Sequence, residues 1–176
     1  NKIGIASVRS GNVIGGGDWA VDRLIPDCFR SLNDNKKIII RNPDAIRPWQ
    51  FVLEPIFGMF SLSLHLRKNP TLFSEPWNFG PSLHKKLTVE QVVKKIIEQW
   101  GQGNYEIHSN KKDKSYHESK ILMLNSTKAN NLLQWKSIYT NTESLFETIE
   151  WYKQYNDKNN MKDFTLKQIE NYVINM

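Results

Sequence analysis

Arg9-Ser10-Gly11-Asn12-Val13-Ile14-Gly15-Gly16-Gly17-Asp18-Trp19 is the stretch that decides how the fold is interpreted. It follows a short apolar run, residues 3–8, which predicts a strand that is covered on both faces of a parallel sheet and ends at Arg9. Glycines let backbone amides approach a ligand, and ligands of open α/β sheets bind beyond the carboxyl ends of strands. The turn therefore either opens a binding site or is a flexible loop. The pattern GxGxxG is absent, so the turn is not a dinucleotide phosphate loop.

A second segment, residues 38–55, points to one family when it is taken together with the first. The resemblance is carried by GNVIGGGDWA from Gly11, DRLIPD from Asp22 and RNPDAIRPWQFVLEP from Arg41. These sequences resemble the extended short-chain dehydrogenase/reductase family that acts on nucleotide sugars, and within it the CDP-glucose 4,6-dehydratases. The dTDP- and GDP-sugar dehydratases and UDP-sugar 4-epimerases share only a skeleton of these positions. The resemblance runs from Ile3 to about Tyr155.

The resemblance implies a fold and a cofactor. We expect an α/β protein made of the C-terminal part of a Rossmann-like doubly wound parallel sheet and the small α/β substrate-binding lobe of this family. Residues 1–155 are expected to form the substrate-binding portion, and residues 156–176 a peripheral tail or helix. NAD is expected to bind to an N-terminal half that this chain lacks.

The resemblance also implies roles for individual residues. Asn12 is expected to bind the diphosphate or sugar of the substrate, Arg47 to bind the diphosphate, and His117 to lie near both. Ser10 and Gly11 are expected to lie beside the nicotinamide. The base is expected to be held by one residue at its polar edge and by three apolar side chains: Arg23, Leu24, Ile25 and Ile40.

The residues alone leave other roles open. Arg47 stands in a mostly apolar stretch, so it needs a partner if it is buried, and a guanidinium suits bidentate contacts with phosphate. A salt bridge to Glu54 or Asp44 would serve equally well. The three apolar side chains assigned to the base are also typical of an ordinary core, and His117 of a protein surface.

The implied reaction converts CDP-glucose to CDP-4-keto-6-deoxyglucose through oxidation at C4, loss of water across C5 and C6, and return of the hydride to C6. Tyr116 and Lys120 have the spacing of the family's catalytic pair, but a strand follows them directly, whereas the pair belongs on a long helix. We therefore expect no catalytic residue here, no activity from this chain alone, and a homodimer of the full-length enzyme. The alternatives are another enzyme of dTDP, GDP or UDP sugars, or a non-catalytic nucleotide-binding module.

Composition excludes several other classes of protein. The chain has 176 residues with 39% hydrophobic and 24% charged residues, enough for one sizeable core, and no apolar run approaches the roughly 20 residues that span a bilayer. The lone Cys28 forms no intrachain disulfide, which is compatible with the cytoplasm that we expect. The histidines lack metal-ligand spacing. The net charge is +6, but the cluster at residues 111–114 lacks interleaved aromatic residues, so we expect neither nucleic acid nor membrane as a partner.

The resemblance implies deoxysugar biosynthesis for the lipopolysaccharide O-antigen.

Local patterns predict the elements that follow the glycine turn. Helices are expected from near Leu24, from Glu54, after a capping box of Thr88 with Gln91, after Asn125 or Ser126, after a cap at Asn141, and over residues 164–174. Strands are expected over residues 37–40, 49–52, 76–79, 104–108 and 121–124.

Overall fold

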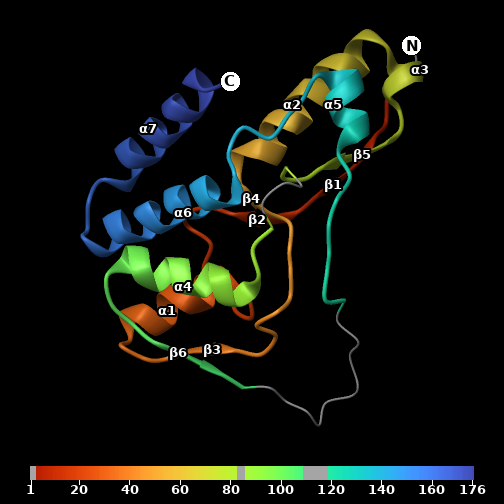
Figure 1. The fold of residues 1–176 in the computed structure, drawn as a ribbon. Helices are drawn as coiled ribbons and strands as arrows, with labels where there is room; N and C mark the ends of the chain where they lie inside the picture. The colour runs from red at the N-terminus through yellow and green to blue at the C-terminus, as the bar shows by residue number, and fades with distance from the viewer. Residues whose placement is uncertain (1–2, 83–85, 109–118) are drawn as a thin grey trace.

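The computed structural model describes residues 3–82, 86–108 and 119–176, and it shows an α/β architecture (Figure 1). All strand pairs in this part of the chain are parallel. Each joins strands that are distant in sequence: β1 (Ser7–Ser10) with β5 (Pro76–Phe79), β2 (Asn12–Ile14) with β4 (Trp49–Phe51), and β3 (Ile38–Ile40) with β6 (Tyr105–Ile107).

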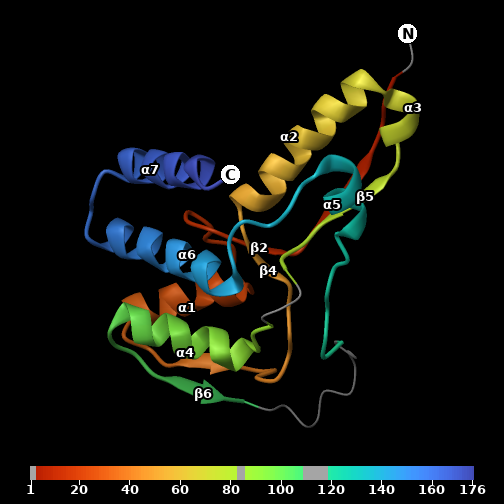
Figure 2. The same ribbon diagram turned by 45° about the horizontal axis from the view of Figure 1, so that its top comes forward.

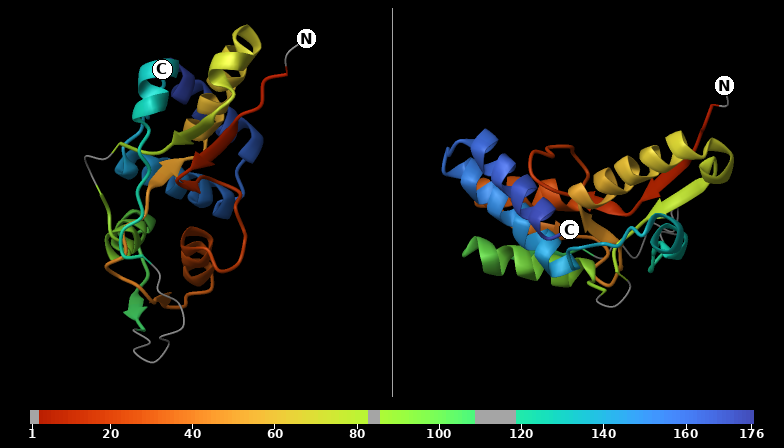
Figure 3. Two further views of the ribbon diagram at one scale, coloured as in Figure 1. Left: turned by 90° about the vertical axis from the view of Figure 1, so that its right-hand side faces the viewer. Right: turned by 90° about the horizontal axis from the view of Figure 1, so that it is seen from above.

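The helices fall into two groups around the β2–β4 pair (Figures 1 and 2). One group, with β1 and β5, consists of α2 (Leu53–Lys68), α3 (Pro70–Phe73) and α5 (Thr127–Leu133). The other, with β3, consists of α1 (Leu24–Asn33), α4 (Val89–Trp100) and α6 (Asn141–Asn156). The last helix, α7 (Met161–Ile174), lies along α6, as the view from above shows (Figure 3).

The first strand differs from its prediction. It begins at Ser7 and runs to Ser10, whereas Ile3 and Ile5, which were expected to be buried, are 84% and 75% exposed. Pairing of β1 with β5 begins at Ser7, so Ile3 and Ile5 precede the paired segment, and no other strand pairs with β1 in the described part of the chain. The prediction of a strand that is covered on both faces is therefore wrong for this chain by itself.

Several helix boundaries follow the local signals. Helix α1 begins at Leu24 with Pro26 in its first turn, and α4 has the complete capping box of Thr88 and Gln91 and ends at Gly101 in the left-handed conformation. The predicted cap at Asn141 is wrong. Thr140 caps α6 instead, because Glu143 three residues later completes a capping box with it.

Two further predictions hold only in part. The strand expected over residues 121–124 is reduced to an isolated bridge between Ile121 and Ile46, and Ile46 also bridges to Thr88 on its other side. Ser126 occupies the cap position of α5, but the hydrogen bond to the backbone of Thr127 is accepted by the side chain of Asn125.

The core that positions the cavity lies between α1, α4, α6 and β3. Its largest fully buried side chains include Phe29, Ile38, Ile96 and Tyr152. Helix α7 adds Tyr172, which is 1% exposed and packs with Phe51. The division of the chain at residue 155 stays a prediction, but α7 is an integral part of the packing.

Candidate functional site

The register of β2 against β4 brings two distant residues of the sequence together. Asn12 pairs with Trp49, and the amide of Asn12 donates a hydrogen bond of 2.8 Å to the carbonyl of Pro48. Arg47 is the residue immediately before Pro48, so it lies at the same end of the strand pair as Asn12. This is the arrangement that a diphosphate bound between the two side chains would require.

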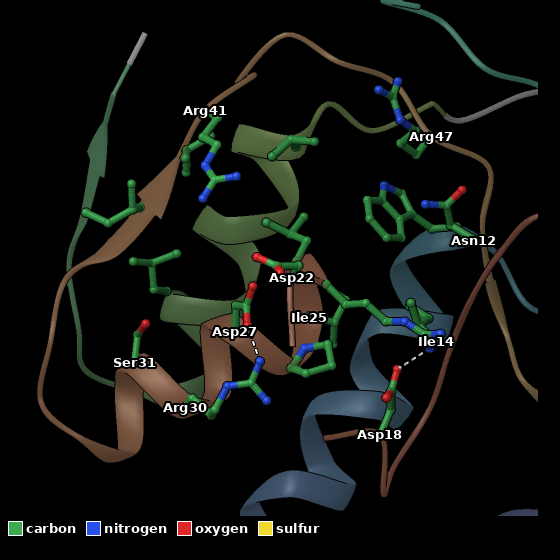
Figure 4. Close-up of a pocket in the computed structure, with 18 of the residues that line it drawn as sticks. Asn12, Ile14, Asp18, Asp22, Ile25, Asp27, Arg30, Ser31, Arg41 and Arg47 are labelled. Carbon is green, nitrogen blue, oxygen red and sulfur yellow. Dashed lines mark hydrogen bonds and ion pairs between the residues drawn. The ribbon is translucent and has the colours of Figure 1, made fainter. Parts of the chain in front are cut away.

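A cavity of about 920 Å³ opens at this point, within the range of small-molecule sites. It lies between α1, β3 and the segments around Asn12 and Arg47, and both apolar and charged side chains line it (Figure 4). Asn12 and Arg47 are at one end of the view, whereas Asp27, Ser31 and Arg41 lie toward the other.

Most of the residues predicted for the site share this cavity. The lining includes six predicted substrate-binding residues and one predicted to lie near the cofactor: Asn12, Arg23, Leu24, Ile25, Ile40, Arg47 and Gly11. Ser10, at the end of β1, is not among the lining residues, and His117 lies outside the described residues. Ile25 and Ile40 also belong to the buried core, and Leu24 packs against it, so the interpretations as core and as cavity wall are both correct. Their roles toward a ligand stay predictions.

Arg47 is held firmly in the wall of the cavity. It is 9% exposed, and its Nη1 donates to the carbonyls of Ile46, Ser119 and Lys120 at 2.9, 3.0 and 3.4 Å. The segment at residues 119–120 is fixed in turn, because Ile46 donates to the carbonyl of Lys120 at 2.8 Å. A guanidinium held in this way loses little conformational freedom when it binds an anion.

The rim of the cavity is fixed by contacts between the glycine turn and two helices. Arg30 of α1 donates to the carbonyls of Trp19 and Ala20 and forms an ion pair with Asp27. Tyr152 of α6 donates to the carbonyl of Asp18, and burial raises the pKa of this tyrosine to about 12. The turn is therefore not a loose loop, and the expectation of a flexible segment is not supported here.

The glycines serve close packing of the backbone. A Cβ on Gly11 would lie 2.2 Å from the carbonyl oxygen of Pro48, and one on Gly16 would lie 2.0 Å from the ring of Trp151. Both distances are far below van der Waals contact. Gly11 is thus needed where β2 crosses the Pro48 backbone, and Gly16 where the turn crosses α6.

Glu54 at the start of α2 is fully buried and serves the fold near the cavity. Its carboxylate accepts hydrogen bonds from the amides of Ile138 and Tyr139, including one of 2.7 Å from Tyr139. Burial raises the pKa of this carboxyl, although the hydrogen bonds from these amides lower it, so the effect of burial is the larger one. Glu54 therefore joins α2 to the segment that leads into α6.

Comparison with known proteins finds a relative of this chain. No protein-family model matches the chain. Over 171 residues it is 42% identical to the CDP-glucose 4,6-dehydratase of Salmonella typhimurium, a match that covers 97% of this chain and 47% of that protein. The similarity therefore extends over nearly the whole of this chain. It spans about half the length of this curated relative.

Solved structures show that the fold of this chain is that of extended short-chain dehydrogenase/reductase enzymes. The UDP-glucuronic acid 4-epimerase of Bacillus cereus, in complex with UDP-glucuronic acid and NAD, matches with a TM-score of 0.69 and 17% identity. That match covers 84% of this chain and 45% of the epimerase. The dTDP-glucose 4,6-dehydratase of Bacillus anthracis, in complex with NAD, matches with a TM-score of 0.66 and 21% identity, covering 85% of this chain and 44% of the enzyme.

Sequence reasoning missed several residues of the cavity. Asp27 and Ser31 line it from one face of α1, below Arg23 at the N-cap, and Arg41 lines it from the end of β3. The spacing of four residues between Arg23, Asp27 and Ser31 is a signal that was present in the sequence. Trp49 also lines the cavity, and no hydrogen-bond partner of its buried Nε1 is found in the described residues.

The chain supplies residues at one side of the expected NAD site but not the whole of the site. Ser10 is half-buried at the carboxyl end of β1, where ligands of parallel sheets bind, and Gly11 follows it at the cavity wall. The sequence contains no GxGxxG turn for the pyrophosphate. Ser10 and Gly11 therefore fit one edge of the cofactor only.

Two searches of the described residues gave negative results. No cluster of three or more histidine, cysteine, aspartate or glutamate side chains is placed to hold a metal ion in the part of the chain that the structure describes. None of the helices in the described ranges is both long and apolar enough to cross a bilayer.

Proposed function

We propose that this chain is the substrate-binding part of an NAD-dependent CDP-glucose 4,6-dehydratase, which converts CDP-glucose to CDP-4-keto-6-deoxyglucose. The observation that carries the proposal is the placing of Asn12 and Arg47 at one end of a single cavity, in a chain that is 42% identical to such an enzyme. NAD, bordered by Ser10 and Gly11, would supply the reversible hydride transfer that this conversion requires.

In this scheme the residues of the chain bind and orient the substrate. Arg47 and Asn12 hold the diphosphate, and the groove between α1 and β3 takes the nucleoside. Fixing both ends of the nucleotide directs the hexose out of the cavity toward Ser10, where the nicotinamide is expected. This is catalysis by positioning, and the acid and base come from residues outside this chain.

The full-length enzyme tests the proposal through binding of CDP. Arg47→Ala should weaken CDP binding roughly 10- to 150-fold, because a hydrogen bond to a charged group contributes about 1.5–3 kcal/mol. Titration calorimetry with CDP, UDP, dTDP and GDP measures this effect and the choice of base together. Arg67→Ala, on the far part of α2, is the matched control and should bind CDP as the parent does.

Three results would contradict the proposal. Unchanged CDP affinity in Arg47→Ala would mean that the guanidinium does not hold the diphosphate. Equal binding of all four nucleotides by the parent would favour the alternative of another nucleotide-sugar enzyme. No binding of any of them would contradict both the dehydratase and the nucleotide-binding module. Gel filtration of the same full-length protein tests the expected homodimer. Its cytoplasmic location and its place in O-antigen synthesis stay predictions.

A further inference from the structure

Helix α1 presents a polar face to the cavity opposite β3. Asp27 and Ser31 are four residues apart on one face of the helix, Arg23 occupies the N-cap position four residues before Asp27, and all three line the cavity. Ile38 and Ile40 line the opposing wall. A flat ring that entered this groove would therefore meet apolar side chains and have its edge directed at the polar face of α1.

Asp27 is the carboxylate on this face that is held in a fixed orientation. Arg30 donates to its Oδ1, and the guanidinium of Arg30 is itself anchored on the carbonyls of Trp19 and Ala20 at 2.8 and 3.0 Å. The Oδ2 atom accepts no hydrogen bond from the residues that the structure describes. Because an ionised carboxylate only accepts hydrogen bonds, Asp27 offers a preset acceptor at the cavity wall.

The other acidic residues of the lining are less suited to this task. Asp18 forms an ion pair with Arg23, and it also accepts from the amide of Ala20. Asp34 lies beyond the end of α1, where it pairs with Lys36 and is 57% exposed. Asp22 precedes the helix on an exposed turn and is the remaining competitor, since it lies close to Asp27 in the cavity view (Figure 4).

We propose that Asp27, oriented by Arg30, selects the base of the substrate by accepting a hydrogen bond from an exocyclic amino group. This inference rests on the proposed function and goes further, because it names the residue that separates cytosine from uracil and thymine. Cytosine carries an amino donor at the position where uracil and thymine carry a carbonyl acceptor, and aspartate accepts from that amino group. Opposite a carbonyl, two acceptors would face each other unpaired, which opposes binding.

Arg41 complements Asp27 in the selection of the base, from the other side of the groove. It follows β3 and extends into the cavity opposite α1 (Figure 4). A guanidinium there can donate to the carbonyl oxygen that all pyrimidines share. An acceptor on one wall and a donor on the other match the edge of cytosine but not that of uracil.

Asp27→Asn in the full-length enzyme tests the inference. Asparagine keeps the size of the side chain but can turn an N–H toward a carbonyl. The ratio of CDP to UDP affinity, measured by calorimetry, should fall roughly 5- to 150-fold, as expected when one base contact is lost. Asp157→Asn makes the same charge change at an exposed position outside the cavity and should leave the ratio unchanged. Asp27→Ser is the second variant, and it should also lower the ratio.

The outcomes separate this inference from the proposed function. A parent that binds CDP more tightly than UDP, with an unchanged ratio in Asp27→Asn and Asp27→Ser, overturns the role of Asp27 and leaves the dehydratase proposal intact. A ratio that changes in Asp22→Asn but not in Asp27→Asn also overturns it. A ratio that falls in Asp27→Asn and Asp27→Ser but not in Asp157→Asn supports the role of Asp27. Weaker binding of every nucleotide in Arg47→Ala, with an unchanged ratio, supports the diphosphate site separately.

Discussion

Replacement of Gly16 by alanine should destabilise the protein by about 2 kcal/mol. The new Cβ would lie 2.0 Å from Cγ and Cδ2 of Trp151, whereas carbon atoms in contact are about 3.5–4.0 Å apart. The Trp151 ring cannot move away easily, because it stacks on the ring of Tyr155 with 5.6 Å between the ring centroids, and its Nε1 donates to Oγ1 of Thr165 at 3.0 Å. Overpacking of this kind costs about 1–3 kcal/mol. Gly16 is not among the glycines with positive φ, so backbone strain adds nothing to the cost.

A double-mutant cycle identifies the source of the loss. The free energy of unfolding of Gly16→Ala, Trp151→Ala and the double variant is measured by denaturant titration in the full-length protein. If the contact with the Trp151 side chain causes the loss, the double variant should be no less stable than Trp151→Ala alone. Residues in contact are expected to couple by about 0.5–3 kcal/mol. If the double variant instead loses the sum of the free energies lost by the two single variants, the reasoning is refuted.

Two further predictions concern buried and capping groups. Because burial raises the pKa of Glu54 above its ordinary value of 4.5, its protonation stabilises the fold below that pH, and this contribution is lost as the pH rises through the raised pKa. The melting temperature of the parent should therefore fall between pH 4.5 and the raised pKa. Glu54→Gln, whose side chain does not titrate, should not show this fall. An identical dependence of the melting temperature on pH in both proteins would contradict the raised pKa of Glu54. Thr140→Ala removes the cap of α6 and should cost about 1 kcal/mol in denaturant unfolding, and a loss near zero would show that the capping box with Glu143 is not formed.

The features that were predicted correctly from sequence are mostly local. Thr88 and Gln91 are three residues apart, so the capping box of α4 can be read without knowledge of the rest of the fold. The same rule applied to Thr140 and Glu143 would have corrected the cap of α6, because a capping residue is chosen by its partner in the third helical position. The position of β1 could not be read in this way. It depends on pairing with Pro76–Phe79, which lie far along the chain, and apolar side chains such as Ile5 do not by themselves indicate what covers them.

The cavity shows a further limit of reading one helix at a time. The apolar stripe of α1, with Phe29 and Leu32, packs into the core, and by the usual rule the opposite polar stripe would face solvent. In the structure β3 returns alongside α1, and the polar stripe with Asp27 becomes a wall of the cavity. Whether a polar helix face meets water or a ligand is thus set by the next strand of the chain and not by the helix. A regular recurrence of charged and hydroxyl residues beside a strand that returns after a short turn, as here, is therefore a reason to look for a binding groove before assuming a solvated surface.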